Sequence, residues 1–196
     1  MKIYNEIIQG SEEWHKIKDL HLSASEAQSI ATAGKGLETL VTELMAQHLS
    51  TAPKETYSNK DLERGIELEA IAADIYELQE GVKLEKVGFV EVDEYTGCSP
   101  DRFIGKDGLW ECKAVNDVNH YKLIRDGLAG VESKYIWQCQ MQMLLTKRKY
   151  NQLCFYNPNF KQSLIIFKIL PDKESFEKLK VGIAEGIKKI KEQLQK

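Results

Sequence analysis

Hydrophobic positions in the N-terminal half of the chain recur every three or four residues, which is the period of amphipathic helices. The segment Ser23-Ala24-Ser25-Glu26 has the S-x-x-E spacing of a capping box, so we expect a helix that begins near Ser23 or Ser25 and ends at Gly34-Lys35-Gly36. Helices with the same period are predicted over residues 37–49 and 61–80, with a polar loop between them and Gly81 closing the second.

From residue 82 the hydrophobic period shifts towards two, as in β-strands. Gly105-Lys106-Asp107-Gly108 predicts a hairpin turn, and Asn157-Pro158-Asn159 predicts a second turn. The predicted strands cover residues 82–92, 96–104, 109–115, 150–156 and 163–170. The predicted helices among and after them cover residues 121–128, 133–146 and 172–195. This order predicts one α/β domain over residues 1–196, with its core in about residues 10–170 and helices flanking a mixed sheet.

Composition limits the class of protein. The chain has 196 residues, of which 42% are hydrophobic and 29% charged, so it can bury a full core and is not a disordered chain. No apolar run approaches the roughly 20 residues that cross a bilayer, and the first residues lack a signal-peptide pattern, so we expect a cytosolic protein. Cys98, Cys112, Cys139 and Cys154 lie 14, 27 and 15 residues apart, a spacing that predicts neither structural zinc nor a disulfide framework.

The two halves of the chain carry charge of opposite sign. Residues 1–100 hold 9 Lys and Arg against 19 Asp and Glu, a net charge of −10, and residues 101–196 hold 18 against 11, a net charge of +7. The total of −3 therefore permits one basic surface on an acidic protein. Two ordinarily solvated faces are the alternative.

Two carboxylates and a lysine are predicted to meet at the first hairpin. Nine residues, including the turn, separate Asp101 from Glu111. On adjacent antiparallel strands these two residues lie across from each other, and Glu111 and Lys113 share a face because strand side chains alternate. Two carboxylates about 4 Å apart repel by roughly 1–4 kcal/mol, which a hard cation such as Mg²⁺ offsets. The pattern is compatible with metal-assisted phosphodiester hydrolysis, but taken alone it is more often an exposed cross-strand salt bridge, because short charge patterns are common.

Three further features could serve such a site. Gly65 lies one turn before Glu69 in a predicted helix, where it costs about 1 kcal/mol; close approach of another backbone would explain it, and chance placement is the alternative. Several amide side chains within residues 138–142 could reach a base edge or a phosphate, or form an ordinary polar helix face. Cations and hydroxyls over residues 14–18 and 23–25 precede a predicted helix N-terminus, an anion-binding arrangement.

Taken in order, these residues resemble the phage lambda exonuclease and YqaJ-type viral recombinase branch of the PD-(D/E)xK nucleases. The resemblance covers roughly residues 10–160. Its motifs are, in chain order, Gly10 to Trp14-His15-Lys16, Ser23-Ala24-Ser25-Glu26, Arg64-Gly65 to Glu69, Cys98-Ser99-Pro100-Asp101, Glu111-Cys112-Lys113, Gln138-x-Gln140 and Tyr156-Asn157-Pro158. The resemblance implies a restriction-endonuclease-like fold, in which helices flank a central mixed sheet.

The resemblance also implies an activity and a set of site residues. It implies a Mg²⁺-dependent exonuclease, with two Mg²⁺ per site that Mn²⁺ can replace, which digests one strand of linear duplex DNA from the 5′ end. The resulting 3′ tails would serve recombination by single-strand annealing, through a homotrimeric ring and an annealing protein, in a bacterial cytosol that holds a phage or prophage. By position, Asp101, Glu111 and the main-chain carbonyl of Cys112 would bind metal, Lys113 would activate water, and Glu69 would complete the acidic site. The residues expected to contact DNA are Lys18, Ser25, Lys35, Arg64, Arg102, Gln138 and Gln140.

The sequence departs from the family pattern at two of these positions. Lys18 stands where the family has an arginine and lacks its bidentate fork, and Arg102 stands where a small glycine is frequent. In sequence position, Lys35 corresponds loosely to a basic residue that binds the 5′-phosphate in the family. The alternatives on the same fold are an endonuclease and a module that binds DNA ends or an annealing protein. Cysteine spacing and length disfavour a Cas4-like or RecB-like enzyme.

Overall fold

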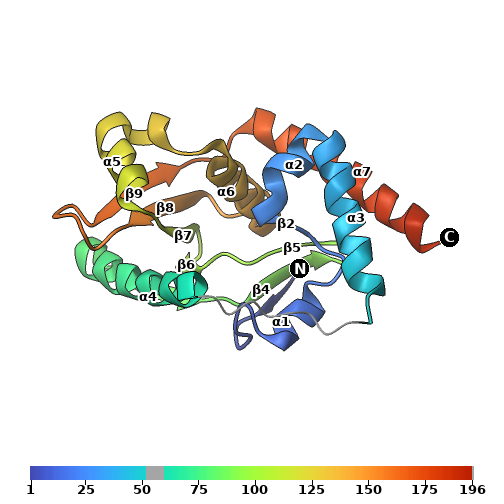
Figure 1. Ribbon diagram of the computed structural model, residues 1–196, viewed down its shortest axis with the longest axis horizontal. Helices are drawn as coiled ribbons and strands as arrows, with labels where there is room; N and C mark the ends of the chain where they lie inside the picture. The colour runs from blue at the N-terminus through green and yellow to red at the C-terminus, as the bar shows by residue number, and fades with distance from the viewer. Residues whose placement is uncertain (52–59, 196) are drawn as a thin grey trace.

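Two β-sheets carry the fold in the computed structural model, which describes residues 1–51 and 60–195 (Figure 1). The larger sheet has the strand order β3-β6-β7-β8-β9, and only β7 and β8 run parallel to each other. Its strands are β3 (Leu84–Lys86), β6 (Arg102–Ile104), β7 (Gly108–Ala114), β8 (Tyr150–Tyr156) and β9 (Leu164–Ile169). The sheet is therefore mixed, as predicted.

Helices cover both faces of this sheet. Helix α4 (Lys60–Glu80) packs on one face, where Ala72 and Tyr76 meet Trp110 and Cys112 of β7 (Figure 1). Helices α5 (Asp117–Asp126) and α6 (Ser133–Thr146) form the crossover from β7 to β8, and α6 covers the other face. Because strand side chains alternate, β7 directs Trp110 and Cys112 towards α4 and Glu111, which lies between them, towards α6.

The smaller sheet brings the N-terminal segment next to the middle of the chain. Its order is β1-β4-β5-β2, with β2 parallel to β5. These strands are β1 (Lys2–Tyr4), β4 (Phe89–Asp93), β5 (Thr96–Cys98) and β2 (Leu22–Ser23), and the short helix α1 (Glu12–Ile17) follows β1. Beside this sheet, α2 (Ala27–Thr32), α3 (Lys35–Leu49) and α7 (Lys173–Leu194) pack together. A Cβ at Gly182 of α7 would lie 1.8 Å from the Ile30 carbonyl oxygen, so α7 and α2 meet backbone to backbone.

Most predicted elements are confirmed with small changes at their ends. Helices α4 and α6 and strand β8 have the expected ranges, Gly81 closes α4 with a φ of 65°, and Gly105 turns the β6–β7 hairpin with a φ of 51°. The helix predicted over residues 121–128 instead begins at Asp117, because the Asn116 side chain accepts a hydrogen bond from the Asn119 N–H (2.9 Å) and caps it. A 3₁₀ turn, η2 (Gly127–Gly130), follows it. The loop predicted between α3 and α4 lies largely at residues 52–59, outside the described residues.

Two predicted strands each divide between the two sheets. Residues 82–92 form β3 and β4 because the chain passes against the N-terminal segment at Gly88, where a Cβ would lie 2.1 Å from the Ile7 carbonyl oxygen. Residues 96–104 form β5 and β6, separated by Ser99-Pro100-Asp101. The segment that carries Asp101 is therefore the bridge from one sheet to the other.

The predicted capping box is wrong. Residues 24–26 form a 3₁₀ turn, η1 (Ala24–Glu26), and the Ser23 side chain makes no capping hydrogen bond. Ala33 ends α2 in the left-handed conformation, and α3 begins at Lys35 rather than at residue 37. Lys35 thus lies in the first turn of a helix and not in a loop.

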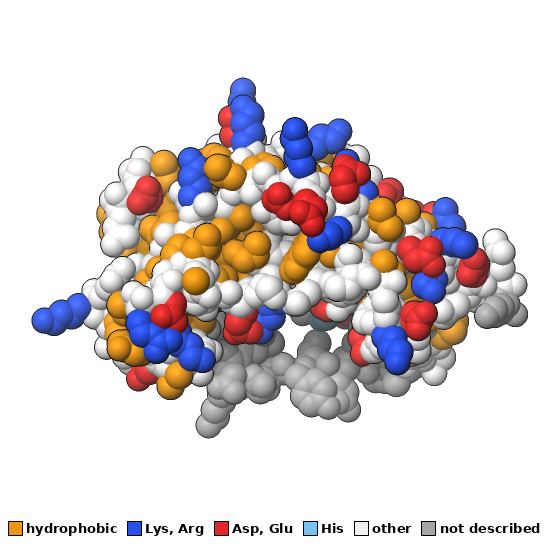
Figure 2. All heavy atoms as spheres, turned by 90° about the horizontal axis from the view of Figure 1, so that it is seen from above, with side chains coloured by type: hydrophobic (Ala, Val, Ile, Leu, Met, Phe, Trp, Pro, Cys, Tyr) orange, Lys and Arg blue, Asp and Glu red, His pale blue; other side chains and the backbone are white. Residues whose placement is uncertain are grey.

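On the face shown in Figure 2, no continuous band of side chains carries charge of one sign. Basic and acidic side chains are interspersed on it, and hydrophobic side chains group in the part where α5 lies. Helix α5 and the turn after it expose Val118, Tyr121, Ile124 and Leu128. Among the described residues, no helix combines the length and the apolarity that a membrane crossing requires.

Candidate active site

Glu111 lies at the centre of the most densely hydrogen-bonded polar cluster of the larger sheet. Its side chain is 2% exposed, on the face of β7 that α6 covers. One carboxylate oxygen, Oε1, accepts hydrogen bonds from Lys113 Nζ (2.6 Å) and Gln138 Nε2 (2.5 Å). The other, Oε2, accepts one from Gln142 Nε2 (2.6 Å). Three donors therefore fix the orientation of this carboxylate.

Asp101 stands one residue before β6, next to Glu111 on the neighbouring strand. The register pairs Arg102 with Trp110, and the Cys112 N–H donates to Asp101 Oδ2 (2.7 Å). Burial, together with the negative charges of Glu111 and Glu69, raises the pKa of the Asp101 carboxyl well above its ordinary value. The ionised form of Asp101 is therefore penalised in the folded protein, and a bound cation would offset this penalty.

Lys113 is the cation closest to Glu111. Burial alone would lower the pKa of Lys113, but the carboxylates of Glu111 and Asp101 outweigh burial and raise it above the ordinary lysine value. Lys113 is therefore an ammonium that donates hydrogen bonds, and its Nζ also lies 5.6 Å from the centre of the Tyr135 ring. The predicted shared face of Glu111 and Lys113 is confirmed.

Glu69 reaches the site from α4 and forms an ion pair with Arg102. The Arg102 guanidinium donates from Nη1 to Glu69 Oε1 (2.7 Å) and to the Asp101 carbonyl oxygen (2.7 Å). Burial raises the pKa of Glu69, and Arg102 opposes this shift while Glu111 adds to it. The third predicted carboxylate is thus present beside the pair, with a guanidinium attached.

The donor set fits a hard divalent cation. In residues 1–51 and 60–195, no three His, Cys, Asp or Glu side chains converge closely enough to form a metal site of their own. Mg²⁺ needs only one or two carboxylates, with carbonyl, water and phosphate oxygens completing its shell. The carboxylates of Asp101 and Glu111 and the main-chain carbonyl of Cys112 are the groups that would hold it.

Of the residues predicted to contact DNA, only Gln138 and Arg102 lie in this cluster. Lys18 Nζ lies 4.6 Å from the centre of the Trp14 ring, and Trp14 Nε1 donates to Oγ of Ser99, two residues before Asp101 (2.9 Å). Ser25 and Lys35 are exposed at the starts of η1 and α3.

Gln140 faces a different part of the molecule. Its side chain is buried, donates to the Leu170 carbonyl oxygen (2.8 Å) and accepts from the Asp172 N–H (2.9 Å). It therefore ties α6 to the start of α7, and the structure does not bring it to the carboxylates.

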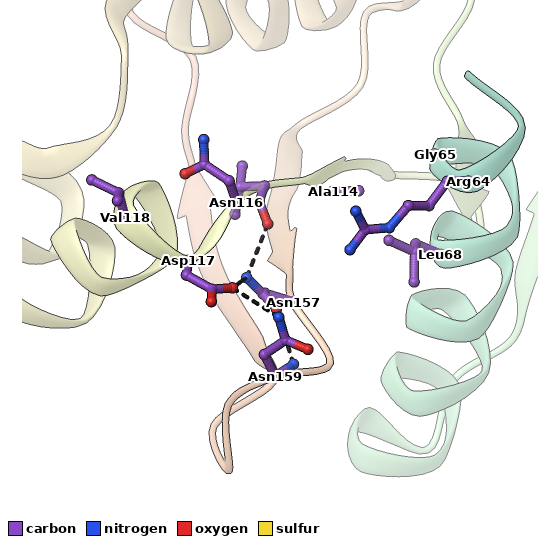
Figure 3. Close-up of a pocket in the computed structure, with 10 residues that line it drawn as sticks. Arg64, Gly65, Leu68, Ala114, Asn116, Asp117, Val118, Asn157 and Asn159 are labelled. Atoms are coloured by element: carbon purple, nitrogen blue, oxygen red, sulfur yellow. Dashed lines mark hydrogen bonds between the residues drawn. The ribbon is translucent and has the colours of Figure 1, made fainter. Parts of the chain in front are cut away.

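Arg64 points into an open cleft beside the end of β7 (Figure 3). The cleft has a volume of about 570 Å³ and lies between α4, the β7–α5 connection and the turn after β8. Asp117 forms part of the opposite wall and accepts hydrogen bonds from Asn157 and Asn159 (both 2.9 Å). Gly65 also lines the cleft, and a Cβ there would meet no atom within 4 Å, so the expected close approach of another backbone is wrong.

Two amide side chains behind Glu111, those of Gln142 and Asn151, are absent from the list of predicted site residues, although Gln142 belongs to the amide-rich segment 138–142. Gln142 is fully buried, and its Oε1 accepts a hydrogen bond from Asn151 Nδ2 (2.7 Å) of β8 while its amide group holds Glu111. Gln142 lies four residues after Gln138, so helical spacing placed both amides on one face of α6. The sequence held this signal, but Asn151 gave none.

Three solved structures, of two different exonucleases, resemble this fold over nearly its whole length. The alkaline exonuclease from Laribacter hongkongensis, alone and in complex with dAMP, superposes with a TM-score of 0.84 at 24% identity, covering 94% of this chain and 95% of that one. A phage-related exonuclease from Haemophilus somnus 129PT superposes with a TM-score of 0.74 at 16% identity, over 89% of this chain and 95% of that one. These similarities show a PD-(D/E)xK nuclease fold. No curated protein matches the sequence significantly.

The family comparison concerns the segment that carries the cluster. The model of the YqaJ-like viral recombinase domain matches residues 13–149, more than half of the chain, including Asp101, Glu111 and Lys113. This match supports a nuclease role in recombination. The chain therefore belongs to the family of YqaJ-like viral recombinase domains.

Proposed function

We propose that this protein is a Mg²⁺-dependent exonuclease that digests one strand of linear duplex DNA from its 5′ end. The observation that carries the proposal is the buried Asp101–Glu111 pair with the Lys113 ammonium bonded to it. Two close carboxylates beside a lysine are what metal-assisted phosphodiester hydrolysis requires. A structural salt bridge would not need the additional amides that hold Glu111.

Each residue of the cluster has a distinct part in the proposed reaction. When bound, Mg²⁺ would neutralise charge on the phosphodiester and make a water molecule more acidic. Asp101 and Glu111 would hold the ion, and the hydrogen bonds from Gln138 and Gln142 fix the orientation of the Glu111 carboxylate. Lys113, as an ammonium, donates to the attacking water or to a phosphate oxygen and so orients them.

We propose the wider setting from the family. The chain would act as one nuclease domain in a homotrimeric ring in the bacterial cytosol, and its 3′ single-stranded products would pass to an annealing protein. The charges of −10 and +7 on the two halves would suit a closed ring built from heterologous contacts. Lys18, Ser25, Lys35 and Arg64 would contact DNA outside the carboxylate cluster.

The substitution Lys113→Ala tests whether this cluster performs the chemistry. It removes the orienting ammonium, and we expect cleavage of linear duplex DNA to fall by about 10²–10⁴-fold. Binding to DNA ends, measured in EDTA by fluorescence anisotropy, should remain close to that of the wild type, because the proposed DNA contacts lie elsewhere. Cleavage that survives the substitution would contradict the mechanism. Parallel loss of binding and cleavage would indicate a misfolded or purely DNA-binding site.

A further inference from the structure

We infer that Arg102 is a resident cation of the active site, which neutralises Glu69 so that each site takes one divalent ion rather than two. This inference rests on the proposed nuclease function and revises the two-ion expectation for this chain. In this inference Arg102 sets the number of divalent ions that the site binds, rather than contacting DNA.

The contacts of Arg102 hold its guanidinium in place. Nη1 lies 2.7 Å from Glu69 Oε1 and donates to the Asp101 carbonyl oxygen at 2.7 Å. The Arg102 side chain is 13% exposed and that of Glu69 is 27% exposed. The guanidinium carbon also lies 6.0 Å from the centre of the Trp110 ring. A guanidinium fixed by a carboxylate, a carbonyl and an aromatic ring is part of the folded site and not a mobile surface charge.

Glu69 and Glu111 reach the site from opposite faces of the hairpin. Arg102 is paired in register with Trp110, whose side chain packs against α4, and Glu69 reaches Arg102 from that same helix. Glu111 is held by amides of α6, which covers the opposite face. Glu69 is therefore committed to Arg102, and Asp101 and Glu111 remain as the carboxylates available to a metal ion.

The charge balance agrees with one ion. Counted by formal charge, the three carboxylates of Asp101, Glu111 and Glu69 against the two cations Lys113 and Arg102 leave a net charge of −1. One divalent ion brings the site to +1, which a single phosphodiester neutralises. Two ions would leave a surplus of positive charge in a largely buried site, which is costly. Without Arg102, the carboxylate of Glu69 would be unpaired, and its negative charge would allow a second divalent ion to bind.

Counting bound Mn²⁺ tests the inference without relying on activity. The full chain is titrated with Mn²⁺ in the absence of DNA, and free Mn²⁺ is measured by electron paramagnetic resonance. We expect one ion per chain in the wild type and in Arg102→Lys, which keeps the charge. We expect two in Arg102→Gln and none in Asp101→Asn. The dependence of the cleavage rate on Mg²⁺ should likewise change from first to second order in Arg102→Gln.

The outcomes separate this inference from the proposed function. Two ions in the wild type, or one ion in a folded Arg102→Gln, would overturn the inference and leave a metal-dependent nuclease standing. The absence of Mn²⁺ binding in the wild type would overturn both. Near-ultraviolet circular dichroism of each variant shows whether it is folded, and Arg102→Ala, which also removes the charge, provides the test if Arg102→Gln is not folded.

Discussion

The carboxylate cluster and the DNA-contacting residues proposed outside it are built in different ways. Glu111 is buried and accepts hydrogen bonds from three side chains, whereas Ser25, Lys35 and Arg64 are exposed. The first region is ordered before any substrate arrives, as electrostatic catalysis requires. The second region would gain its interactions from DNA. Substitutions in the cluster should therefore lower kcat, and substitutions outside it should raise KM.

The substitution Asp101→Asn should have the largest effect and acts on the cluster alone. It removes one of two metal-binding carboxylates, and we expect cleavage to fall by about 10³-fold or more, since metal stabilisation is worth several kcal/mol. Asparagine keeps an oxygen for the Cys112 N–H and is nearly the same size. The measurement is single-turnover digestion of linear duplex DNA in saturating Mg²⁺.

The same variant should be more stable than the wild type in EDTA. Burial and the neighbouring charges of Glu111 and Glu69 raise the pKa of Asp101, so the folded state is penalised at neutral pH, where this group is ionised in the unfolded chain. Asparagine removes this penalty, and the urea midpoint should rise. The gain should shrink as the pH falls to the ordinary range of an aspartate, because protonation then removes the same charge. A variant less stable than the wild type at neutral pH would contradict the electrostatic account.

Gln142 and Gln140 offer a matched pair on one helix. Both are buried and make two hydrogen bonds, but Gln142 holds Glu111 and Asn151 whereas Gln140 holds the start of α7. We expect either alanine substitution to lower the free energy of unfolding by about 1–3 kcal/mol, because buried polar partners are left unpaired. Only Gln142→Ala should also lower kcat, by about 10–100-fold. A raised KM in Gln140→Ala would instead support the DNA contact that the family resemblance implies.

Arg64→Ala should have a smaller effect and act on binding. The side chain points into the cleft beside β7, so its loss should raise KM a few-fold, leave kcat unchanged and reduce the salt dependence of binding by about one phosphate contact. Lys178→Ala on α7 makes the same change in net charge and serves as the control. An equal effect of both variants would mean that net charge, and not the cleft, matters.

Gly65→Ala should have the smallest effect, with the opposite sign on stability. A Cβ at this helical position meets no atom within 4 Å, so alanine should raise the free energy of unfolding by about 0.5–1 kcal/mol in urea titrations. Gly182→Ala is the contrasting control, since its Cβ would lie 1.8 Å from the Ile30 carbonyl oxygen and should destabilise the protein. Unchanged stability in Gly65→Ala would show that this part of α4 is not helical in solution.

The parts of the site that sequence could predict are local in the chain. The hairpin turn and the period of two were sufficient to place Asp101, Glu111 and Lys113 together, because these residues lie on adjacent strands of one hairpin. The predicted ranges of α6 and β8 hold because their hydrophobic patterns are long and regular. Local pattern therefore predicts both the chemistry and the elements that carry it.

The parts that sequence could not predict depend on contacts between distant segments. Residues 82–92 have the sequence pattern of one strand, but in the structure the contact of Gly88 with the Ile7 carbonyl oxygen divides them between two sheets. Gln138 and Gln140 are two residues apart on one helix, yet the fold turns one to Glu111 and the other to α7. The pairing of Arg102 with Glu69 likewise needs α4 to lie against the hairpin. No local period carries this information.

Digestion of end-labelled DNA tests the central claim most directly. Linear duplex DNA labelled at either the 5′ or the 3′ end is incubated with the protein in Mg²⁺ and in EDTA, beside covalently closed circles. The account predicts Mg²⁺-dependent release of mononucleotides from the 5′ label first, with intact circles and no digestion in EDTA. Cutting of closed circles would indicate an endonuclease. Retained binding to DNA ends without cleavage in Mg²⁺ or Mn²⁺ would contradict the claim that Asp101, Glu111 and Lys113 form a nuclease site.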